Sequence, residues 1–444
     1  MKYLIKNARI INDGAISEGD LLTDGVFISK IAREISASLA DRVIDIAGNF
    51  LIPGAIDDQV HFREPGLTHK GNIASESRAA IAGGITTFIE QPNTVPNAVT
   101  LEILEEKYSI ASQNSFANYS FMLGATNDNI SEVVRIDPKR IAGVKIFMGS
   151  STGNMLVDNE TALEQIFRHS PTLIAVHCED EATVRANLEH YKEIYGENIP
   201  PEAHPLIRSA EACFLSSSRA VALAKSTGAR LHIFHVSTAR ETKLFDNIIP
   251  LSQKKITAEA CIHHLWFSDA DYAKTGNFIK WNPAVKTAED REALWNALID
   301  GRIDVIATDH APHTIEEKNQ KYLQAPSGGP MVQHAVVAMF DSFQKRNLPL
   351  ELLVEKMSHN PAILFEIEKR GFIREGYFAD MAIVDADSPW QVAADNILYH
   401  CGWSPMEGIT FNSRVTHTFV NGNLVYENGV VNSQPFGQRL QFNR

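Results

Sequence analysis

The sequence is poor in cysteine and in positive charge. Its 444 residues include four cysteines that lie far apart and form no CxxC pair, at Cys178, Cys213, Cys261 and Cys401. This spacing argues against a zinc ribbon or a disulfide scaffold, and a reducing cytoplasm is the expected location. Lys and Arg number 41 against 54 Asp and Glu, for a formal net charge of -13, and no basic run would follow a phosphate backbone. We therefore expect no nucleic acid partner.

Long apolar runs and glycine-rich nucleotide motifs are also missing. The opening segment, MKYLIKNARIINDG, interrupts its apolar residues with Lys2, Lys6 and Arg9, so it predicts an alternating strand and not a signal peptide. No later stretch is long and apolar enough to span a bilayer, so no membrane association is expected. No GxGxxG motif follows the first strand of the central region, which disfavours a dinucleotide-binding fold.

The two ends of the chain share a pattern of short strands and tight turns. Residues 1–53 alternate strand-like runs with turns, and residues 366–444 repeat this pattern around Glu-Gly, Asn-Gly and Glu-Asn-Gly signals. The pattern predicts a small antiparallel sheet at each end. We expect both ends to form one β-sandwich, with residues 54–365 as a continuous central domain.

The central region alternates short apolar runs with longer helical patterns, as an α/β fold with a parallel sheet requires. Eight candidate strands lie at residues 54–62, 84–92, 118–125, 142–149, 172–180, 230–237, 255–264 and 303–313. Eight such strands predict a closed TIM-type (β/α)8 barrel, and a doubly wound open sheet is the alternative. Each candidate strand ends in polar or ionisable residues, at the end where such barrels have their active sites.

The segment DDQVHFREPG, at the end of the first of these strands, has one unusual position. A His-x-His pair there would present two imidazoles to one cation, because alternate strand residues point to the same side. In this chain Gln59 stands first and His61 second. Ionisable groups also end four later strands, at Lys145, His177, His235 and Asp309. A single histidine is more often a structural residue, but the set together suits Zn²⁺ or a similar divalent ion.

Lys145 and Asp309 require roles of their own. A protonated ammonium is no ligand, but if burial and nearby cations lower the pKa of Lys145, its neutral amine can react with CO₂ to form a carbamate that bridges two metals. The alternative for Lys145 is an ion pair with an acidic neighbour. Asp309 could bind one metal and pass a proton from a metal-activated water to a leaving nitrogen. The alternative for Asp309 is a helix N-cap or a turn.

Further residues are candidates for substrate binding. Arg63 lies two residues beyond His61, hence on the same side of an extended chain, and its planar guanidinium suits a carboxylate. The alternative for Arg63 is a surface ion pair with Glu64. Other candidates for the same cleft, of types also common in turns and on surfaces, are Asn93, Asn282 and His313. Two Gly- and Ser-containing segments, residues 149–159 and 325–334, are candidates for mobile or substrate-contacting backbone.

Taken in order, the motifs resemble those of a known family. HFREPG, EQPNTVPN, GVKIFMG, VHCED, HIFHVS, TAEACIHHL, NPAVK and TDHAPH are similar to the motif series of the dihydroorotases, within the amidohydrolase superfamily. ADMAIVD and GNLVYENG extend the resemblance into the family's β-sandwich, so it covers nearly the whole chain. Allantoinases tend to have Asn-Glu where this chain has Phe62-Arg63, and dihydropyrimidinases lack the Arg-Glu-Pro-Gly signature; both are alternative cyclic amidohydrolases.

The resemblance implies a reaction and a set of roles. The reaction is the reversible cyclisation of N-carbamoyl-L-aspartate to L-dihydroorotate, with Asp309 as proton shuttle. Arg63, Asn93 and His313 would hold the substrate carboxylate, and Asn282 would face the ring. By the same resemblance the metal ligands are His177 with His235, His61 with Asp309, and a carboxylated Lys145 between the two positions. One or two Zn²⁺, or another divalent ion, would be bound, and a homodimer is the family expectation.

The chain departs from the family pattern at Gln59, where a histidine is usual. A glutamine oxygen is a neutral, harder ligand than imidazole, so the site with His61 and Asp309 is expected to bind its ion more weakly. Two metals, one metal and no catalysis all remain open. In the last case the chain would be a non-catalytic partner of aspartate transcarbamoylase, and an enzyme could also associate with that protein. Since only one ligand has changed, we favour an active enzyme.

Overall fold

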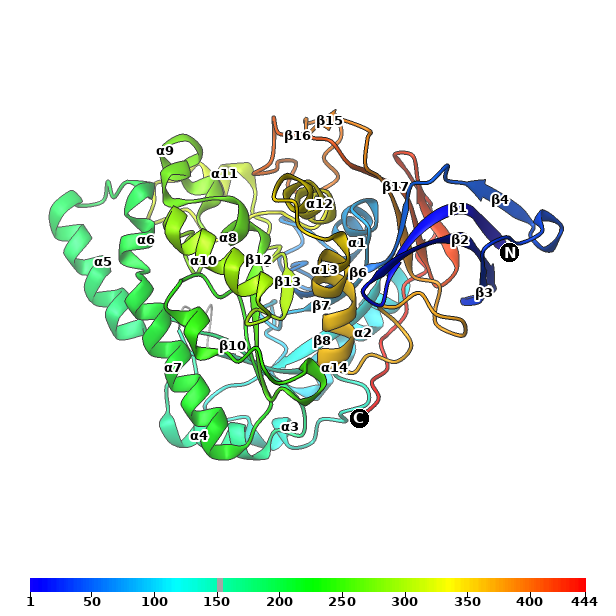
Figure 1. Cartoon of the computed structure of the whole chain (residues 1–444). Helices are drawn as coiled ribbons and strands as arrows, with labels where there is room; N and C mark the ends of the chain where they lie inside the picture. Colours follow the sequence, from blue (N-terminus) through cyan, green and yellow to red (C-terminus); the bar gives the residue numbers. More distant parts are fainter. Residues whose placement is uncertain (150–154) are drawn as a thin grey trace.

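Eight parallel strands form a closed barrel at the centre of the molecule (Figure 1). The computed structural model describes residues 1–149 and 155–444, and the barrel strands are paired in chain order from β6 to β13. The strands are β6 (Ala55–Val60), β7 (Ile85–Glu90), β8 (Asn118–Gly124), β9 (Gly143–Phe147), β10 (Ile174–His177), β11 (Leu231–Ile233), β12 (Ile256–Cys261) and β13 (Val305–Ala307). A parallel bridge between Val60 and His310 joins the first strand to the segment after the last. The predicted barrel is confirmed, and the open-sheet alternative is wrong.

Helices follow the barrel strands and cover the outside of the barrel (Figure 1). Several begin where a side chain accepts a backbone N–H of the first turn, as at Asn72, Thr100, Asp180, Ser209 and Thr287. The longer helices are α1 (Ile73–Ala82), α2 (Leu101–Asn114), α4 (Glu160–His169), α5 (Glu181–Tyr195), α7 (Ala210–Thr227), α10 (Ala288–Ile299) and α12 (Ala335–Lys345). The shorter ones are α3 (Ile130–Val133), α6 (His204–Ile207), α8 (Ile262–Trp266), α9 (Tyr272–Thr275), α11 (Ile315–Lys318), α13 (Leu350–Val354) and α14 (Asn360–Phe365). Within residues 1–149 and 155–444, none has both the length and the apolar character needed to cross a bilayer.

Two apolar clusters lie on the two sides of the barrel wall. Outward residues such as Val144 and Ile174 belong to a large cluster shared with the surrounding helices. A separate cluster takes single residues from several different strands, among them Ile56, Ile89 and Met122, and such residues meet only in the barrel interior. The barrel interior therefore contains a packed apolar core.

Strands from both chain ends form one further sheet of nine strands. The N-terminal strands are β1 (Tyr3–Asn12), β2 (Ala15–Asp24), β3 (Phe27–Ala32), β4 (Arg42–Asp45) and β5 (Phe50–Pro53). The C-terminal strands are β14 (Met381–Asp385), β17 (Arg414–Val420), β18 (Asn423–Glu427) and β19 (Val430–Val431), and β14 pairs antiparallel with β5. A separate two-stranded ladder joins β15 (Trp390–Gln391) to β16 (Thr410–Phe411). In Figure 1 the blue and red strands lie side by side at the right of the barrel.

This sheet confirms that both ends build one β-structure, which has an apolar cluster of its own. The expectation of a purely antiparallel sheet is wrong for two pairs, because β1 pairs in parallel with β4 and with β5. After β3 the chain crosses to the edge of β1 that β2 leaves free. There β4 and β5 run in the same direction as β1. Since β5 ends at Pro53 and α14 at Phe365, we propose domain boundaries at 1–53, 54–365 and 366–444.

The last residues of the chain close the end of the barrel opposite the cavity described below. Leu440 and Phe442 are buried in the interior cluster. Arg444 donates to the carbonyl oxygens of Ile141 (3.2 Å) and Ala142 (2.9 Å), directly before β9 begins. The C-terminal tail is therefore part of the barrel core.

We expect Phe442→Ala to lower the free energy of unfolding by roughly 3 kcal/mol, because it removes a buried aromatic ring from a packed cluster. Urea unfolding followed by circular dichroism measures the change. The exposed neighbour Gln441 provides a matched control, and Gln441→Ala should change stability by less than about 0.5 kcal/mol. Equal stability of the two variants would show that the tail does not contribute to the core.

Candidate active site

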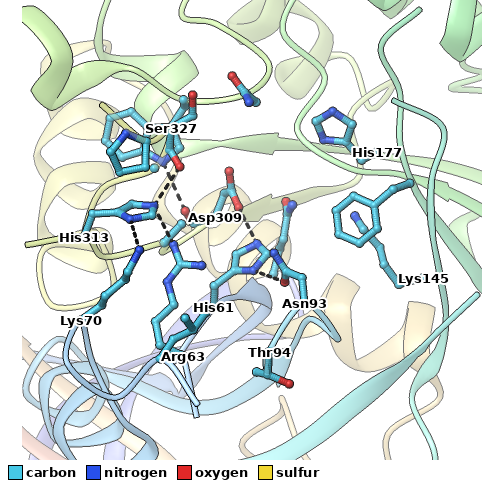
Figure 2. Close-up of a pocket in the computed structure, with 18 of the residues that line it drawn as sticks. His61, Arg63, Lys70, Asn93, Thr94, Lys145, His177, Asp309, His313 and Ser327 are labelled. Atoms are coloured by element: carbon cyan, nitrogen blue, oxygen red, sulfur yellow. Dashed lines mark hydrogen bonds and ion pairs between the residues drawn. The ribbon is translucent and has the colours of Figure 1, made fainter. Parts of the chain in front are cut away.

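A cavity of about 690 Å³ lies at the carboxyl ends of the barrel strands. Figure 2 shows how its side chains point toward a common centre. All the sequence-predicted site residues line it: Gln59, His61, Arg63, Asn93, Lys145, His177, His235, Asn282, Asp309 and His313. They come from β6, β9 and β10 and from loops that follow barrel strands. Barrel closure thus brings together groups that are spread over about 250 residues of sequence.

Hydrogen bonds between the first and last barrel strands fix the position of the site. The Asp57 carboxylate accepts the Thr308 hydroxyl (2.5 Å) and the Thr308 N–H (3.2 Å). The N–H of His61 donates to the carbonyl oxygen of His310 (2.7 Å). These bonds hold His61 and Asp309 on neighbouring segments at the seam of the barrel.

Three cavity residues have a left-handed backbone. The φ angles are 71° for Arg63, 39° for His235 and 46° for Asp309. Such angles are uncommon for residues other than glycine, and they concentrate at functional sites. These angles also correct the sequence argument that strand alternation places Arg63 on the same side as His61. Because β6 ends at Val60 and the chain turns at Arg63, the Arg63 side chain reaches the cavity by a bend and not by strand alternation.

His177 and His235 face each other as a pair of potential metal ligands. His177 Nδ1 lies 3.0 Å from His235 Nε2, and His177 Nε2 lies 2.9 Å from Glu179 Oε2. Burial raises the pKa of Glu179, but the charge of Arg208 and the bond from His177 outweigh it and bring that pKa to about 2. Ionised Glu179 keeps a proton on His177 Nε2 and directs the Nδ1 lone pair toward His235. The pair fits one divalent ion, because donors around tetrahedral zinc lie roughly 3.3 Å apart.

His61 is held between Asn93 and Asp309. Its Nδ1 lies 2.7 Å from Asn93 Oδ1, an acceptor, so Nδ1 has the proton and Nε2 the lone pair. Nε2 lies 3.2 Å from Asp309 Oδ1. Burial raises the pKa of Asp309 to about 7 and lowers that of His61 well below its usual value. Two acceptor atoms at this distance need a proton or a cation between them, so the pair fits a second metal position. Asn93 thus orients His61, in addition to the substrate role expected for it.

Lys145 is buried against two phenylalanine rings. The residue is 1% exposed, and its Nζ lies 4.1 Å from the ring centroid of Phe234 and 5.0 Å from that of Phe147. The alternative of a direct ion pair with an acidic neighbour is not formed within residues 1–149 and 155–444. Burial lowers the pKa of Lys145 to about 7, so much of the amine is neutral near neutral pH. This state fits the carbamate chemistry that the sequence suggested.

Arg63 belongs to a cationic group on one wall of the cavity. The residue is 7% exposed, its Nε donates to the Pro312 carbonyl oxygen (3.0 Å), and its Nη2 lies 3.0 Å from His313 Nε2. Lys70 Nζ lies 3.0 Å from His313 Nδ1, and the three side chains are adjacent in Figure 2. Burial is the main reason that the pKa of His313 lies well below its usual value, so the ring is neutral. Lys70 also pairs with Glu317 (2.8 Å), so Arg63 is the cation of this group that is suited to an anion in the cavity.

The alternative ion pair between Arg63 and Glu64 is not formed among the described residues. Glu64 Oε2 instead accepts the N–H of Ile73 (2.9 Å), at the start of α1. Arg63 is therefore turned away from solvent and toward the cavity.

Backbone from residues 325–334 also borders the cavity. Pro326, Ser327 and Gly328 line it, and the Ser327 carbonyl oxygen lies 3.0 Å from His313 Nε2. Gly328 has a φ of 128°, and a Cβ there would lie 2.5 Å from the Ala311 carbonyl oxygen, so only glycine fits. The other segment expected to provide mobile or substrate-contacting backbone is residues 149–159, of which positions 150–154 lie outside the described residues.

Gln59 lies in the cavity wall and is 1% exposed. Its Oε1 is 3.6 Å from Cys261 Sγ, a weak contact. The pairing of β6 with β7 shifts register between Asp57 and Val60, so consecutive residues here do not alternate regularly. Gln59 is near the histidines as expected, with a neutral amide in place of an imidazole.

Sequence reasoning missed the groups that orient these ligands. Glu179 follows His177 by two residues in VHCED, a signal that could have been used. Lys70 is close to Arg63 in sequence and offered a weaker signal. Arg208, which pairs with Glu179, and Glu76, whose Oε2 lies 2.8 Å from His310 Nε2, are remote in sequence and gave none.

Comparisons with known proteins agree with this geometry. A model of the amidohydrolase family matches residues 50–425. The chain is 33% identical to a dihydroorotase of Halobacterium salinarum, over 90% of this chain and 92% of that protein. It is 32% identical to a dihydroorotase of Staphylococcus epidermidis, over 96% of this chain and 99% of that protein. The chain therefore belongs to the amidohydrolase family, and its class is that of the metal-dependent cyclic amide hydrolases.

Solved structures with the same fold include hydantoinases. The L-hydantoinase (dihydropyrimidinase) from Arthrobacter aurescens superposes with a TM-score of 0.94 at 29% identity, over 99% of both chains. The dihydropyrimidinase from Brevibacillus agri gives a TM-score of 0.88 at 23% identity, over 100% of both chains, which shows the fold alone.

Gln59→His should tighten the binding of one divalent ion by roughly tenfold or more, because imidazole replaces a neutral amide oxygen. Competition of each protein with a chelator, followed by metal analysis of the protein fraction, measures the change. Gln59→Asn, which keeps the amide, is the control and should show no tightening. Identical metal retention by the histidine variant and the unchanged protein would place Gln59 outside the metal shell.

Proposed function

We propose that this protein catalyses the dihydroorotase reaction, the reversible cyclisation of N-carbamoyl-L-aspartate to L-dihydroorotate in pyrimidine biosynthesis. The observation that supports this most directly is the buried Arg63, which lies beside His313 on the wall of the cavity that also holds the ligand set. A cyclic amide without a carboxylate would leave this cation unpaired in a desolvated site, at a cost of several kcal/mol. Dihydroorotate provides a carboxylate next to its ring amide.

The carboxylate would lie against Nη1 of Arg63, beside His313. Nε and Nη2 of Arg63 contact Pro312 and His313, while Nη1 has no hydrogen-bond partner among the described residues. The guanidinium is thus held by the protein before substrate arrives, which lowers the entropy cost of binding. Asn93 would supply a further amide contact, and Asn282 would face the ring.

Asp309 would transfer the proton. In hydrolysis it takes a proton from the attacking water and gives it to the departing ring nitrogen; in cyclisation the steps are reversed. Its position 3.2 Å from His61 and its pKa of about 7 without a metal suit both directions near neutral pH. A divalent ion held by the histidines, Asp309 and carboxylated Lys145 would polarise the carbonyl and acidify the water when bound.

Hydantoin or dihydropyrimidine hydrolysis is the second candidate, favoured by the TM-score of 0.94 to the Arthrobacter aurescens L-hydantoinase. The third is a non-catalytic partner of aspartate transcarbamoylase, favoured by Gln59.

We also propose a cytoplasmic homodimer. Size-exclusion chromatography with light scattering, alone and with aspartate transcarbamoylase, tests both associations.

The first experiment is an ultraviolet assay of dihydroorotate formation and hydrolysis by purified protein, with metal content measured on the same preparation. Dihydrouracil, hydantoin and allantoin serve as competing substrates. We expect turnover of dihydroorotate with one or two divalent ions bound. Preference for dihydrouracil or hydantoin would support the second candidate. No turnover of any substrate by folded protein with added zinc and bicarbonate would support the third.

Arg63→Met should reduce kcat/KM for dihydroorotate by roughly a hundredfold or more, since removing one partner of a buried charge pair costs about 3 kcal/mol. Dihydrouracil, which lacks only the carboxylate, is the matched substrate, and its slower hydrolysis should be little affected. The ratio of the two kcat/KM values in wild-type and variant protein is the measurement. Equal losses for both substrates would mean that Arg63 supports the fold of the site and does not recognise the carboxylate.

Lys145 should form a carbamate, because its amine is buried and has a pKa of about 7. ¹³C NMR of protein equilibrated with zinc and ¹³C-bicarbonate should show a carbamate signal that Lys145→Arg abolishes. Lys280 is a matched control, since its pKa is also about 7, but its Nζ donates to the carbonyl oxygens of Tyr322 and Ala325 (2.6 Å each). Lys280→Arg should keep the signal. A signal that survives Lys145→Arg would contradict the assignment.

A further inference from the structure

Three ionisable side chains meet inside the barrel beneath the cavity, and the proposed reaction uses none of them. Asp58 from β6, His232 from β11 and Glu259 from β12 are each 0% exposed, and we call them the interior triad. Their ligand atoms lie within 4.8 Å of one another. None of the three lines the cavity, but Glu259 Oε1 accepts the backbone N–H of His235 (3.1 Å), which does.

Hydrogen bonds fix the ring of His232. The Thr257 hydroxyl donates to the Leu231 carbonyl oxygen (3.2 Å), so its oxygen is the acceptor for His232 Nδ1–H at 2.8 Å. His232 Nε2 therefore points between the two carboxylates. Burial lowers the pKa of His232, but hydrogen bonds and charges from Asp58 and Glu259 outweigh it and bring that pKa to about 9, so a bound ion would take the place of the Nε2 proton. A ring nitrogen oriented by a hydrogen bond from the opposite nitrogen is the usual arrangement of a metal-binding histidine.

The distances within the triad are those of ligands around an ion. His232 Nε2 lies 3.3 Å from Asp58 Oδ2 and 3.6 Å from Glu259 Oε2. Charge-assisted hydrogen bonds are shorter, at about 2.7–2.9 Å, and the buried pair of His310 with Glu76 in this chain measures 2.8 Å. Donor atoms on a tetrahedral ion with bonds of about 2.0–2.2 Å lie roughly 3.3–3.6 Å apart.

Beyond the two ion-pair contacts of His232, the inward polar atoms of the triad have no partner among the described residues. Both carboxylate oxygens of Asp58, Oε2 of Glu259 and Nε2 of His232 have no hydrogen-bond partner among the described residues. Glu259 Oε1, in contrast, is fixed by His235 and by Cys261 Sγ (3.1 Å), so Oε2 is turned toward His232. A buried polar atom without a partner is costly. A proton on His232 balances one of the two negative charges, and burial with the charge of Asp58 raises the pKa of Glu259 to about 7. A divalent cation would replace these protons and balance both carboxylates.

We propose that the interior triad binds one divalent transition ion, Zn²⁺ or Mn²⁺, as a site separate from the ligands that line the cavity. Two carboxylates and one imidazole are a ligand set suited to either ion. The ion would link β6, β11 and β12 and, through Glu259, hold the backbone of His235 in place. This inference does not depend on the substrate of the proposed reaction.

The direct test is a crystal structure of the zinc-loaded full chain with anomalous data at the zinc edge. We expect a peak within about 2.0–2.2 Å of Asp58, His232 and Glu259. Zinc content of a His177→Asn, His235→Asn variant tests the same point in solution, since the substitutions remove one cavity metal position. This variant should still hold an ion after chelator treatment, and adding Asp58→Asn should remove it, a loss of one zinc per chain.

Asp304→Asn is the matched control, since Asp304 is also buried but pairs with Lys254 (2.7 Å). In the same background it should leave the zinc content unchanged. Zinc content unaffected by Asp58→Asn, or anomalous peaks at the cavity histidines alone at saturating zinc, would overturn the proposal. The crystallographic result decides the matter even if a variant fails to fold, and neither measurement depends on activity.

Discussion

Burial of ionisable groups at the carboxyl end of the barrel is the constraint on which the rest of the site depends. Removing these groups from water lowers the pKa of Lys145 to about 7 and raises the pKa of Asp309 to about 7. A neutral amine and a carboxyl group that can exchange its proton are thereby available in one cavity. The same burial forces the other polar groups to find partners, and this explains the chain of contacts from Arg208 through Glu179 to His177.

The barrel interior contains polar groups at two levels. The upper level lines the cavity, and the lower one consists of Asp58, His232 and Glu259. Asp58 lies at the lower level and Gln59 at the upper level, because the pairing of β6 with β7 shifts register between Asp57 and Val60. Cys261 contacts both Gln59 and Glu259, so the departure at Gln59 and the interior triad are structurally connected. Asp58 and Gln59 are adjacent in the sequence, and their side chains converge on Glu259 and Cys261.

The cationic wall of the cavity is the feature that would separate a substrate with a carboxylate from neutral cyclic amides. The barrel and the ligand set are compatible with any cyclic amide hydrolase, and the similarity to the Arthrobacter aurescens L-hydantoinase reflects this shared framework. In the proposed reaction, specificity would instead depend on Arg63 and His313, which Lys70 contacts while it pairs with Glu317. Charge complementarity in a desolvated site discriminates more strongly than shape alone.

The sequence alone determined the eight strands, the pairing of both chain ends and the cavity residues, because strand periodicity and strand-end chemistry are local properties. It did not determine the parallel pairing of β1 with β4 and β5, the bend at Arg63 or the Asn93 contact with His61. These depend on crossovers and backbone turns that local patterns do not encode. The interior triad is the clearest case: Asp58, His232 and Glu259 are isolated polar residues in sequence, and only closure of the barrel brings their ligand atoms within 4.8 Å.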